Sequence, residues 1–453
     1  MDLTKGSVPK VLLIFSLPIV AQMSIQPLFG VIDRIFIAQI GPDAFNAVIN
    51  ASVFQMLVIM LAAGLANGVT SYVARLVGAG NLSEADNAAW HAMIIMVVFS
   101  ALTIALFYAV ERPFFEMLGL KPEFFGRAHS FIRVIVLGNI TIMFTLIGAN
   151  ILRGEGNSMT PLLIAIVTVG LNLVLAPLLI FGPADELFGL RVGWLGLDVF
   201  GGGLATVISR AAGCVMLVGY LLLGRSVWSF SLRNFRWNPR HIAEILKVGL
   251  PMLLVNLSAW LSSIVYLRVL NSYPGAVEAY GMGMQLDMLA VLPMIGLMLG
   301  VIGMVGQNFG AGNLSRAKRT AWVGGVYAAL FALAMGLLYM IFPGFWVSLF
   351  NKGSDPEIMR LGRNFILIVG LTYPFASLVF VLGGAFQGLG KGMPPLIITA
   401  TRFILVAIPI VLILPRYIGP DGAWWATAAS HVVGGIMAII WLKAEFRRRN
   451  VEG

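Results

Sequence analysis

One carboxyl group lies deep inside a long apolar stretch near the start of the chain. Asp33 follows the run Leu28–Ile32 and precedes the Gly41-Pro42 turn by about seven residues, which is roughly 10 Å of helix. If the stretch spans a membrane, a charge at that depth costs several kcal/mol unless it is neutralised or paired. Burial favours the protonated form of a carboxyl group, which suits a group that takes up and releases a proton. The alternative is structural, as a pair with a neighbouring helix or an acid that reaches the aqueous interface.

Polar residues accompany Asp33 on the same segment. Pro27 has no N–H to donate to the carbonyl of Met23, so a helix can bend just before the acid. Gln22 and Gln26 lie about 11 and 7 residues before Asp33, spacings that place them on roughly its face of a helix. We therefore predict that both glutamines are polar residues of a substrate cavity.

Two further polar residues interrupt apolar segments of the first half. Asn172 lies mid-segment between Gly170 and Pro177, and Thr206 follows Ala205. An amide at such a place serves helix packing as readily as ligand binding. A threonine in a helix can bond its own backbone. Neither residue indicates a function by itself.

The second half carries its own charged residues within apolar segments. Asp287 stands about ten residues into one segment and Arg402 near the middle of another. An ion pair between them would remove the free-energy cost of burying each charge alone, so we expect a structural ion pair. A role in a substrate cavity is the alternative. Arg210 and His431 occupy matching positions in the two halves and are expected toward the cytoplasmic side.

The sequence excludes several kinds of chemistry. Cys214 is the only cysteine, so no intramolecular disulfide and no Cys/His metal cluster or cysteine redox site can form. No Walker loop, nucleophile elbow or His-Glu-x-x-His motif occurs. We expect no cofactor, no resident metal and no enzymatic activity.

Composition identifies a polytopic membrane protein. The chain is 59% hydrophobic and 11% charged, whereas a soluble protein carries about 25% charged residues. The apolar run from Val11 to Ile40 is too long for the apolar region of a signal peptide, so we interpret it as a retained first helix. Twelve apolar segments follow one another, at roughly 11–40, 44–77, 87–110, 124–152, 159–182, 201–223, 242–270, 277–309, 320–342, 358–387, 393–414 and 422–442.

The two halves of the chain repeat one another. Gly78–Ser83 returns as Gly310–Ser315, 232 positions later, and 9 of 13 positions match across 78–90 and 310–322. Six segments per half is an even number, which predicts parallel repeats related by an axis along the membrane normal. Weaker matches support the repeat, joining Met159–Ile164 to Met393–Ile398 and Ala205-Thr206 to Ala426-Thr427.

The repeat predicts an all-α fold of twelve transmembrane helices in two pseudo-symmetric six-helix bundles. The bundles would comprise residues 1–223 and 242–453, joined by a polar cytoplasmic linker at 224–241.

The positions of Lys and Arg predict the orientation. If the N-terminus is cytoplasmic, seventeen of the 30 fall on cytoplasmic segments, ten fall opposite and three lie within spans. Both termini are then cytoplasmic. The excess of Lys and Arg on cytoplasmic segments accounts for the net charge of +10, so we expect no nucleic-acid partner.

Several motifs resemble those of the MATE (multidrug and toxic compound extrusion) family, over nearly the whole chain. They are the stretch from Pro18 through Asp33, the paired Gly-Ala-Gly-Asn motifs, Arg153–Asn157, Gln307–Gly312 and Gly388–Lys391. The resemblance implies a V-shaped antiporter that exports organic cations against inward H⁺ or Na⁺ and alternates access between two bundles.

The resemblance also implies a cation-coupling site. In the DinF-like and archaeal branch, the acid of the first helix acts with an asparagine, a second acid and a threonine. Asp33, Asn172 and Thr206 match this pattern, but Ala176 stands where the second acid belongs. A single buried carboxylate fits H⁺ better than Na⁺, which requires several oxygen ligands, so Na⁺ at these three residues is the weaker candidate.

The NorM-like pattern fits less well. Acids in its seventh and tenth helices align with Ala259 and Ala376, so the chain is closer to the DinF-like branch. The partners implied are a small cationic or amphipathic substrate and membrane lipids. We expect a monomer in a bacterial or archaeal cytoplasmic (inner) membrane, since a duplicated bundle encloses its own cavity.

Two other functions remain open from the sequence. One is a flippase or exporter of a lipid-linked or amphipathic lipid-like substrate, whose cavity would need several cationic residues; only Arg34, Arg210 and Arg402 lie within spans. The other is a channel or a structural membrane protein. The 22 Met and 29 Phe residues mostly face lipid or core, and a fraction could line an adaptable apolar cavity between the halves.

Overall fold

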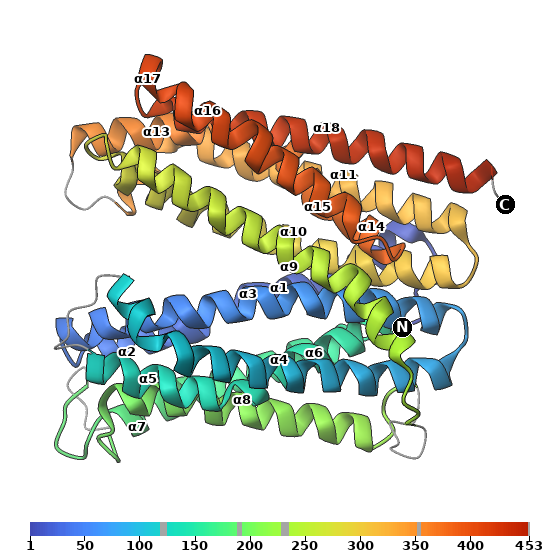
Figure 1. The fold of residues 1–453 in the computed structure, drawn as a ribbon, viewed down its shortest axis with the longest axis horizontal. Coiled ribbons are helices and arrows are strands. Elements are labelled where there is room, and N and C mark those ends of the chain that lie inside the picture. Colours follow the sequence, from blue (N-terminus) through green and yellow to red (C-terminus); the bar gives the residue numbers. More distant parts are fainter. Residues whose placement is uncertain (118–124, 188–192, 228–234, 351–354, 452–453) are drawn as a thin grey trace.

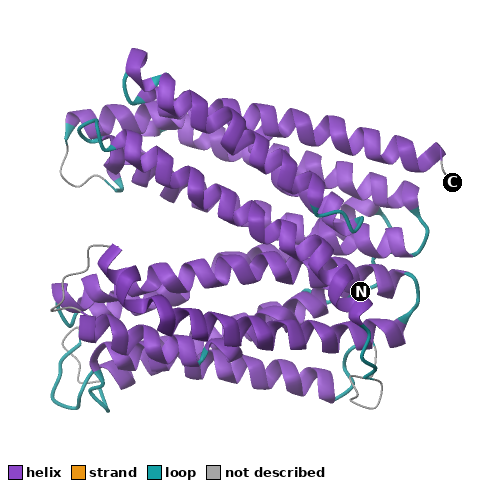
Figure 2. Ribbon diagram, viewed as in Figure 1, coloured by secondary structure: helices purple, strands orange, loops and turns teal. Residues whose placement is uncertain are grey.

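The computed structural model describes residues 1–117, 125–187, 193–227, 235–350 and 355–451, and nearly all of them are helical (Figure 2). The first half forms α1 (Val8–Ile25), α2 (Leu28–Ala38), α3 (Pro42–Gly78), α4 (Leu82–Met117), α5 (Phe125–Leu137), α6 (Asn139–Gly154), α7 (Met159–Ile180) and α8 (Asp198–Leu222). The second half forms α9 (Pro239–Leu270), α10 (Ala276–Gly310), α11 (Leu314–Ile341), α12 (Pro343–Ser348), α13 (Pro356–Gly370), α14 (Tyr373–Gly388), α15 (Met393–Ala400), a π-helix (Thr401–Ala407), α16 (Ile408–Ile413), α17 (Pro415–Ile418) and α18 (Asp421–Val451).

The prediction of twelve spans is confirmed for the described part of the chain. Ten helices are long and apolar enough to cross a membrane, and two bent pairs bring the total to twelve. The pair α5 and α6 bends by 47° around Gly138, and α13 and α14 bend by 54°. Pro374 opens the second helix of the latter pair, where its missing N–H is tolerated.

Two further irregular places lie within spans. The first span is interrupted at Gln26 and Pro27, between α1 and α2, which confirms the predicted weak point before Asp33. The eleventh span contains a π-helical stretch at Thr401–Ala407 that includes Arg402. Such turns are rare and frequently occur at functional sites.

The helices form two lobes arranged as a V. In Figure 1, α2 to α8 make one lobe and α10 to α18 the other, apart at one end and together at the other. Both termini lie toward the end where the lobes meet. We call this the closed end and the opposite one the open end.

The first helix connects the two lobes. Leu12, Phe15 and Ile19 of α1 are buried in one apolar cluster with residues of α10, α11, α14 and α18. Phe29 and Phe36 of α2 are instead buried in the core of the first lobe. The break at Gln26 and Pro27 therefore separates a part of the first span that packs on the second lobe from a part that packs on the first.

The repeated glycine motif forms the contact at the closed end. A Cβ on Gly78 would lie 1.9 Å from the carbonyl oxygen of Gln307, and a Cβ on Gly310 would lie 2.0 Å from that of Arg75. Arg75 and Gln307 are themselves 232 positions apart, so the two contacts are equivalent by the repeat. Each glycine lets the backbone of the opposite lobe approach where no other residue fits.

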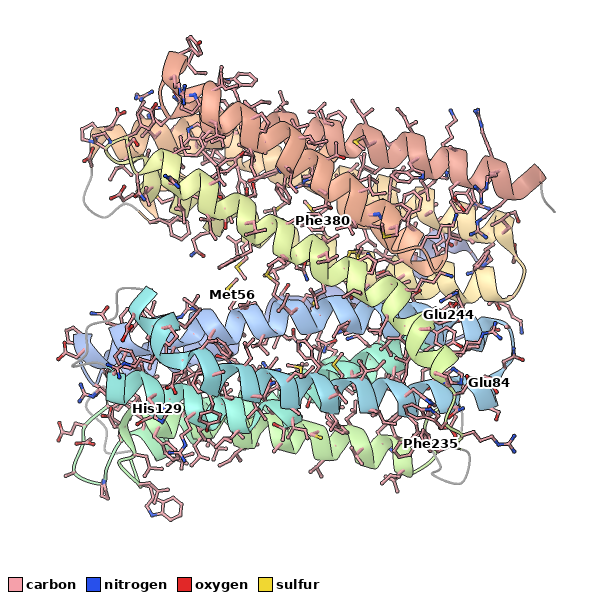
Figure 3. The ribbon with its side chains drawn as sticks, viewed as in Figure 1. Met56, Glu84, His129, Phe235, Glu244 and Phe380 are labelled. Atoms are coloured by element: carbon pink, nitrogen blue, oxygen red, sulfur yellow. The ribbon has the colours of Figure 1, made fainter. Side chains whose placement is uncertain are left out.

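Polar contacts reinforce this closed end. Arg75 of α3 forms an ion pair of 3.2 Å with Glu244 of α9, which Figure 3 places where the lobes meet. Gln307 Nε2 donates to the Gly154 carbonyl at 2.9 Å. Of the linker expected at 224–241, residues 228–234 lie outside the described residues, and α9 already begins at Pro239.

Candidate functional site

Three helices bring Asp33, Asn172 and Thr206 together. Asp33 lies on the buried face of α2 and is 7% exposed. Its Oδ2 accepts a hydrogen bond of 2.9 Å from Thr206 Oγ1 on α8. The same hydroxyl accepts a bond of 3.2 Å from Asn172 Nδ2 on α7. Residues 173 positions apart thus form one chain of hydrogen bonds.

The three residues leave two buried oxygens without a partner. Asp33 Oδ1 and Asn172 Oδ1 have no hydrogen-bond partner among the described residues and are shielded from solvent. Orphaned buried acceptors are costly; a proton can satisfy the carboxylate oxygen of Asp33, and a small cation could satisfy either oxygen. Ala176, one helical turn after Asn172, is fully buried and supplies no oxygen ligand from its side chain. Among the described residues no group of three His, Cys, Asp or Glu could hold a metal ion.

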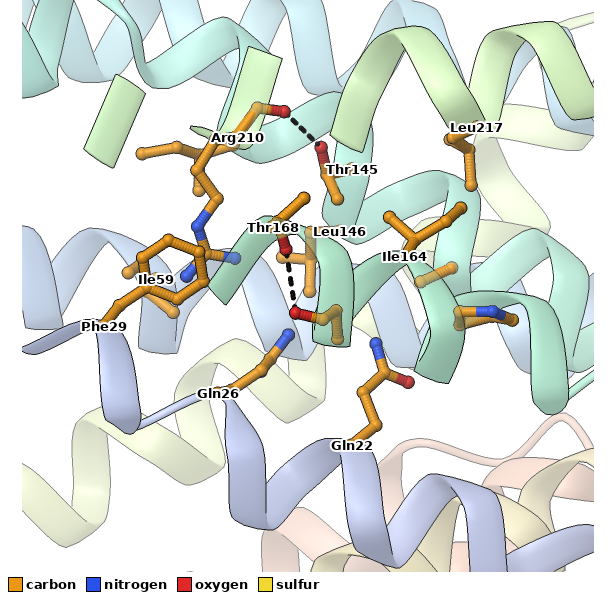
Figure 4. Close-up of a pocket in the computed structure, with 14 residues that line it drawn as sticks. Gln22, Gln26, Phe29, Ile59, Thr145, Leu146, Ile164, Thr168, Arg210 and Leu217 are labelled. Atoms are coloured by element: carbon orange, nitrogen blue, oxygen red, sulfur yellow. Dashed lines mark hydrogen bonds between the residues drawn. The ribbon is translucent and has the colours of Figure 1, made fainter. Parts of the chain in front are cut away.

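A small first-half cavity of about 50 Å³ lies one helical turn from this site, since Phe29, Thr168 and Arg210 line it and the three site residues do not (Figure 4). Its polar lining comprises Gln22, Gln26, Thr145, Thr168 and Arg210. The Arg210 guanidinium lies 3.9 Å from the centre of the Phe29 ring. The Arg210 guanidinium lies over Phe29, one helical turn before Asp33 on α2, and forms no ion pair with that carboxyl group. The Arg210 side chain therefore points inward from α8 toward α2. His431 is likewise buried, beside the Thr372 hydroxyl at 3.0 Å.

A larger cavity of about 270 Å³ lies between the two halves. Its apolar lining includes Met23, Met252, Met298 and Phe403, as well as Phe380, which Figure 3 labels in the second lobe. This confirms that some of the abundant Met and Phe side chains line a cavity between the halves. Its polar lining comprises Gln26, Asn67, Asn150, Arg153, Asn256, Gln387, Thr399 and Arg402.

Comparisons with known proteins agree with this architecture. A model of the MatE family matches residues 18–178 and again residues 251–413. The chain belongs to the MatE family. This assignment makes it a multi-pass membrane transporter and not an enzyme.

Relatives of the MatE family match over almost their whole length. The chain is 26% identical to a probable multidrug resistance protein, NorM, of Thermotoga maritima, covering 99% of this chain and 96% of that one. It is 25% identical to an FAD transporter of Shewanella oneidensis, covering 96% and 94%. It is also similar to the outward-facing conformation of a multidrug resistance MATE transporter, with a TM-score of 0.90, 25% identity and coverage of 99% and 98%.

The structure does not pair Asp287 with Arg402, so that expectation is wrong. The Tyr373 hydroxyl on α14 donates to Asp287 Oδ1, within the second lobe. Arg402 forms no ion pair with any described residue and lies 4.4 Å from the centre of the Phe403 ring. Asp287 is not among the residues that line the central cavity, whereas Arg402 is. The two charges thus face different surroundings in this MatE protein.

Arg153 is a cavity residue that the sequence analysis did not single out. Arg153 is 2% exposed and lines the central cavity from the end of α6. Its Nη2 donates to Gln22 Oε1 at 2.7 Å. One feature of the sequence could have pointed to Arg153 as a cavity residue. It corresponds to Gln387 at the offset of 234 positions, and both residues line the cavity. Of the predicted cavity glutamines, Gln26 lines both cavities and Gln22 only the first-half one.

Proposed function

We propose that this MatE protein is a secondary active antiporter that exports small organic molecules from the cytoplasm, driven by inward H⁺ carried on Asp33. The observation that carries the proposal is the buried Asp33 carboxyl, with one unpartnered oxygen, just after the break in the first span. The multidrug resistance protein and the multidrug MATE transporter to which the chain is similar support export of drug-like molecules.

The break between α1 and α2 supplies a route from the proton to the cargo. Protonation of Asp33 removes the negative charge that accepts the bond from Thr206 and attracts Arg210. The resulting movement of α2 is transmitted to Gln26, which lies at the break and lines both cavities. One turn earlier, Gln22 holds Arg153 in the wall of the central cavity. The same helix thus connects the coupling group to the cargo site.

We favour H⁺ over Na⁺ as the coupling ion and the DinF-like branch over the NorM-like one. A Na⁺ ion would receive the unpartnered oxygens of Asp33 and Asn172 and the hydroxyl of Thr206. Hard cations prefer six or so oxygen ligands, and Ala176 removes the second carboxylate. A proton needs only one acceptor, which Asp33 Oδ1 supplies.

From the positive-inside rule we infer that the closed end and both termini are cytoplasmic and that the V opens outward. We infer a bacterial or archaeal inner membrane and a monomer, with bundles of residues 1–223 and 242–453 on either side of the cavity.

Export from proteoliposomes tests the coupling. The cargo probes are ethidium, a cation, and FMN, an anion, and the drive is an imposed pH gradient or a Na⁺ gradient. We expect the pH gradient to drive export of at least one probe by the wild type and by Asp287→Asn, a matched loss of a carboxyl group in the other half. Asp33→Asn should abolish that export. Undiminished export by Asp33→Asn would refute the role of Asp33, and export driven by Na⁺ alone would replace H⁺ with Na⁺.

A second candidate function is a flippase or exporter of a lipid-linked or amphipathic lipid-like substrate. The observation that favours it is the presence of Arg153 and Arg402 in the wall of the central cavity, where cationic side chains could receive a phosphate. This function predicts that a lipid phosphate binds in the central cavity in preference to a water-soluble molecule.

A further inference from the structure

We propose that the cargo of the central cavity carries an oxyanion, a phosphate or a carboxylate, attached to an apolar or aromatic body. This inference rests on the proposed export function and adds the charge of the cargo to it. The family resemblance implied an organic cation, so the inference reverses the expected sign.

The first observation is that the cavity holds two buried guanidinium groups and no acid to compensate them. Arg153 is 2% exposed and Arg402 is 6% exposed. Neither forms an ion pair with a described residue, and no Asp or Glu is among the described residues that line the cavity. Buried cations without a counter-charge are costly, and an anion in the cavity removes that cost.

The second observation is that both guanidinium groups keep donors free. The partners of Arg153 are neutral, since it donates to Gln22 Oε1 at 2.7 Å and to Asn150 Oδ1 at 3.2 Å. The Nε atoms of Arg153 and Arg402 are buried and find no hydrogen-bond partner in the part of the chain that the structure describes. The planar fork of arginine matches the paired oxygens of a carboxylate or phosphate. A cationic cargo would instead meet two like charges.

The third observation comes from the internal repeat. At the offset of 234 positions, Arg402 corresponds to Thr168 of the first half. Gly213 corresponds to Gly434 at the offset of 221 positions that also relates Thr206 to Thr427. A Cβ on Gly213 would lie 2.7 Å from Thr168, and a Cβ on Gly434 would lie 3.1 Å from Arg402 Cδ. The packing against a glycine is therefore common to both halves, and the arginine is the feature that distinguishes the second. It sits in the π-helical stretch and reaches the shared cavity.

The remaining lining suits the other end of such a molecule. Met252, Met298, Phe380 and Phe403 present adaptable apolar surface to an aromatic or aliphatic body. The amides of Asn67 and Asn256 add neutral hydrogen-bonding groups. Apolar walls with a few convergent polar groups are typical of small-molecule sites.

Equilibrium binding to the purified protein, without any ion gradient, tests the proposal. Riboflavin and FMN share one fluorescent ring system and differ by a phosphate, and ethidium supplies a cation. We expect FMN to bind at least tenfold more tightly than riboflavin or ethidium. Arg402→Gln should remove the difference between FMN and riboflavin, Arg402→Lys should retain part of it, and Arg268→Gln, an exposed arginine on α9, should leave it unchanged.

Equal binding of FMN and riboflavin, tighter binding of ethidium, or a preference for FMN that survives Arg402→Gln would each overturn the proposal. The wild-type comparison decides the matter even if Arg402→Gln fails to fold. Displacement of FMN by dioctanoyl phosphatidylglycerol, but not by dioctanoyl phosphatidylcholine, would assign the anion to a lipid headgroup. FMN that no lipid displaces would assign it to a soluble cargo.

The outcome is separable from that of the coupling experiment. FMN that binds as expected but is moved by neither gradient would contradict antiport while leaving the charge of the cavity established. Export of ethidium that depends on Asp33, without preferential binding of FMN, would contradict the anionic cargo alone.

Discussion

Substitution of Gly78 should open the closed end of the V by an amount that the structure sets. The Cβ of an alanine would lie 1.9 Å from the Gln307 carbonyl oxygen, whereas ordinary van der Waals contact begins at 3.4 Å. The backbones of α3 and α10 must therefore separate by about 1.5 Å. Overpacking of this kind costs about 1–3 kcal/mol. Because this contact exists only when the lobes meet at the closed end, the substitution destabilises the state in which that end is closed and not the state in which it is open.

That cost corresponds to a shift of roughly 5- to 150-fold in the ratio between states that are closed and open at this end. Gly310→Ala should produce a similar shift, because its Cβ would lie 2.0 Å from the Arg75 carbonyl oxygen. Gly170→Ala is the matched control. Nothing lies within 4 Å of a Cβ on this helical glycine, so its substitution should leave the ratio unchanged.

The ratio can be measured as a distribution of distances between spin labels. Ser83 and Ser315, equivalent exposed residues of the repeat, can be replaced by cysteine after removal of the free Cys214. We expect a narrow short distance in the parent and a second, longer population with Gly78→Ala. An unchanged distribution in both glycine variants would refute the assignment of these contacts as the closure of the V.

Three further outcomes follow from individual contacts. Thr206→Val removes the hydroxyl that donates to Asp33 and should lower the rate of gradient-driven export at least tenfold, which corresponds to about 1.4 kcal/mol. Thr206→Ser keeps a hydroxyl and should retain export. Equal export rates for the two variants would contradict the role of the hydroxyl. Burial raises the pKa of the Glu155 carboxyl above its ordinary value of 4.5, so the folded protein holds this proton more tightly than the unfolded chain does. The thermal stability of the wild type should therefore decrease as the pH rises from 4.5, and Glu155→Gln should flatten that dependence, which a melting series checks. Arg316 donates to the carbonyls of Lys5 and Gly6 at 2.7 and 2.6 Å. Arg316→Ala should therefore speed amide hydrogen exchange in residues 3–7 relative to the wild type. Unchanged protection of these amides would count against the contact.

The sequence alone determined the class of protein and the number of its spans. Apolar stretches of about 20 residues have few alternatives to transmembrane helices, because hydrocarbon satisfies no backbone polar group and the helix satisfies its own. Pro27 predicted the interruption before Asp33, because the missing N–H is a local property of the chain. The repeat of Gly78–Ser83 at Gly310–Ser315 predicted two equivalent halves, because one sequence pattern specifies one local structure twice.

Only the tertiary structure decided which of the polar residues meet. Asp33 and Thr206 are 173 positions apart, and no local pattern fixes which faces of α2, α7 and α8 turn together. The predicted pair of Asp287 and Arg402 failed for the same reason, since packing turned one toward Tyr373 and the other toward the central cavity. The burial of Arg153 in the cavity wall was not predicted, because an arginine at the end of a helix looks the same in sequence whether it faces solvent or a cavity. The charge of the cavity arises from residues on separate helices, so it exists only once both lobes have folded around it.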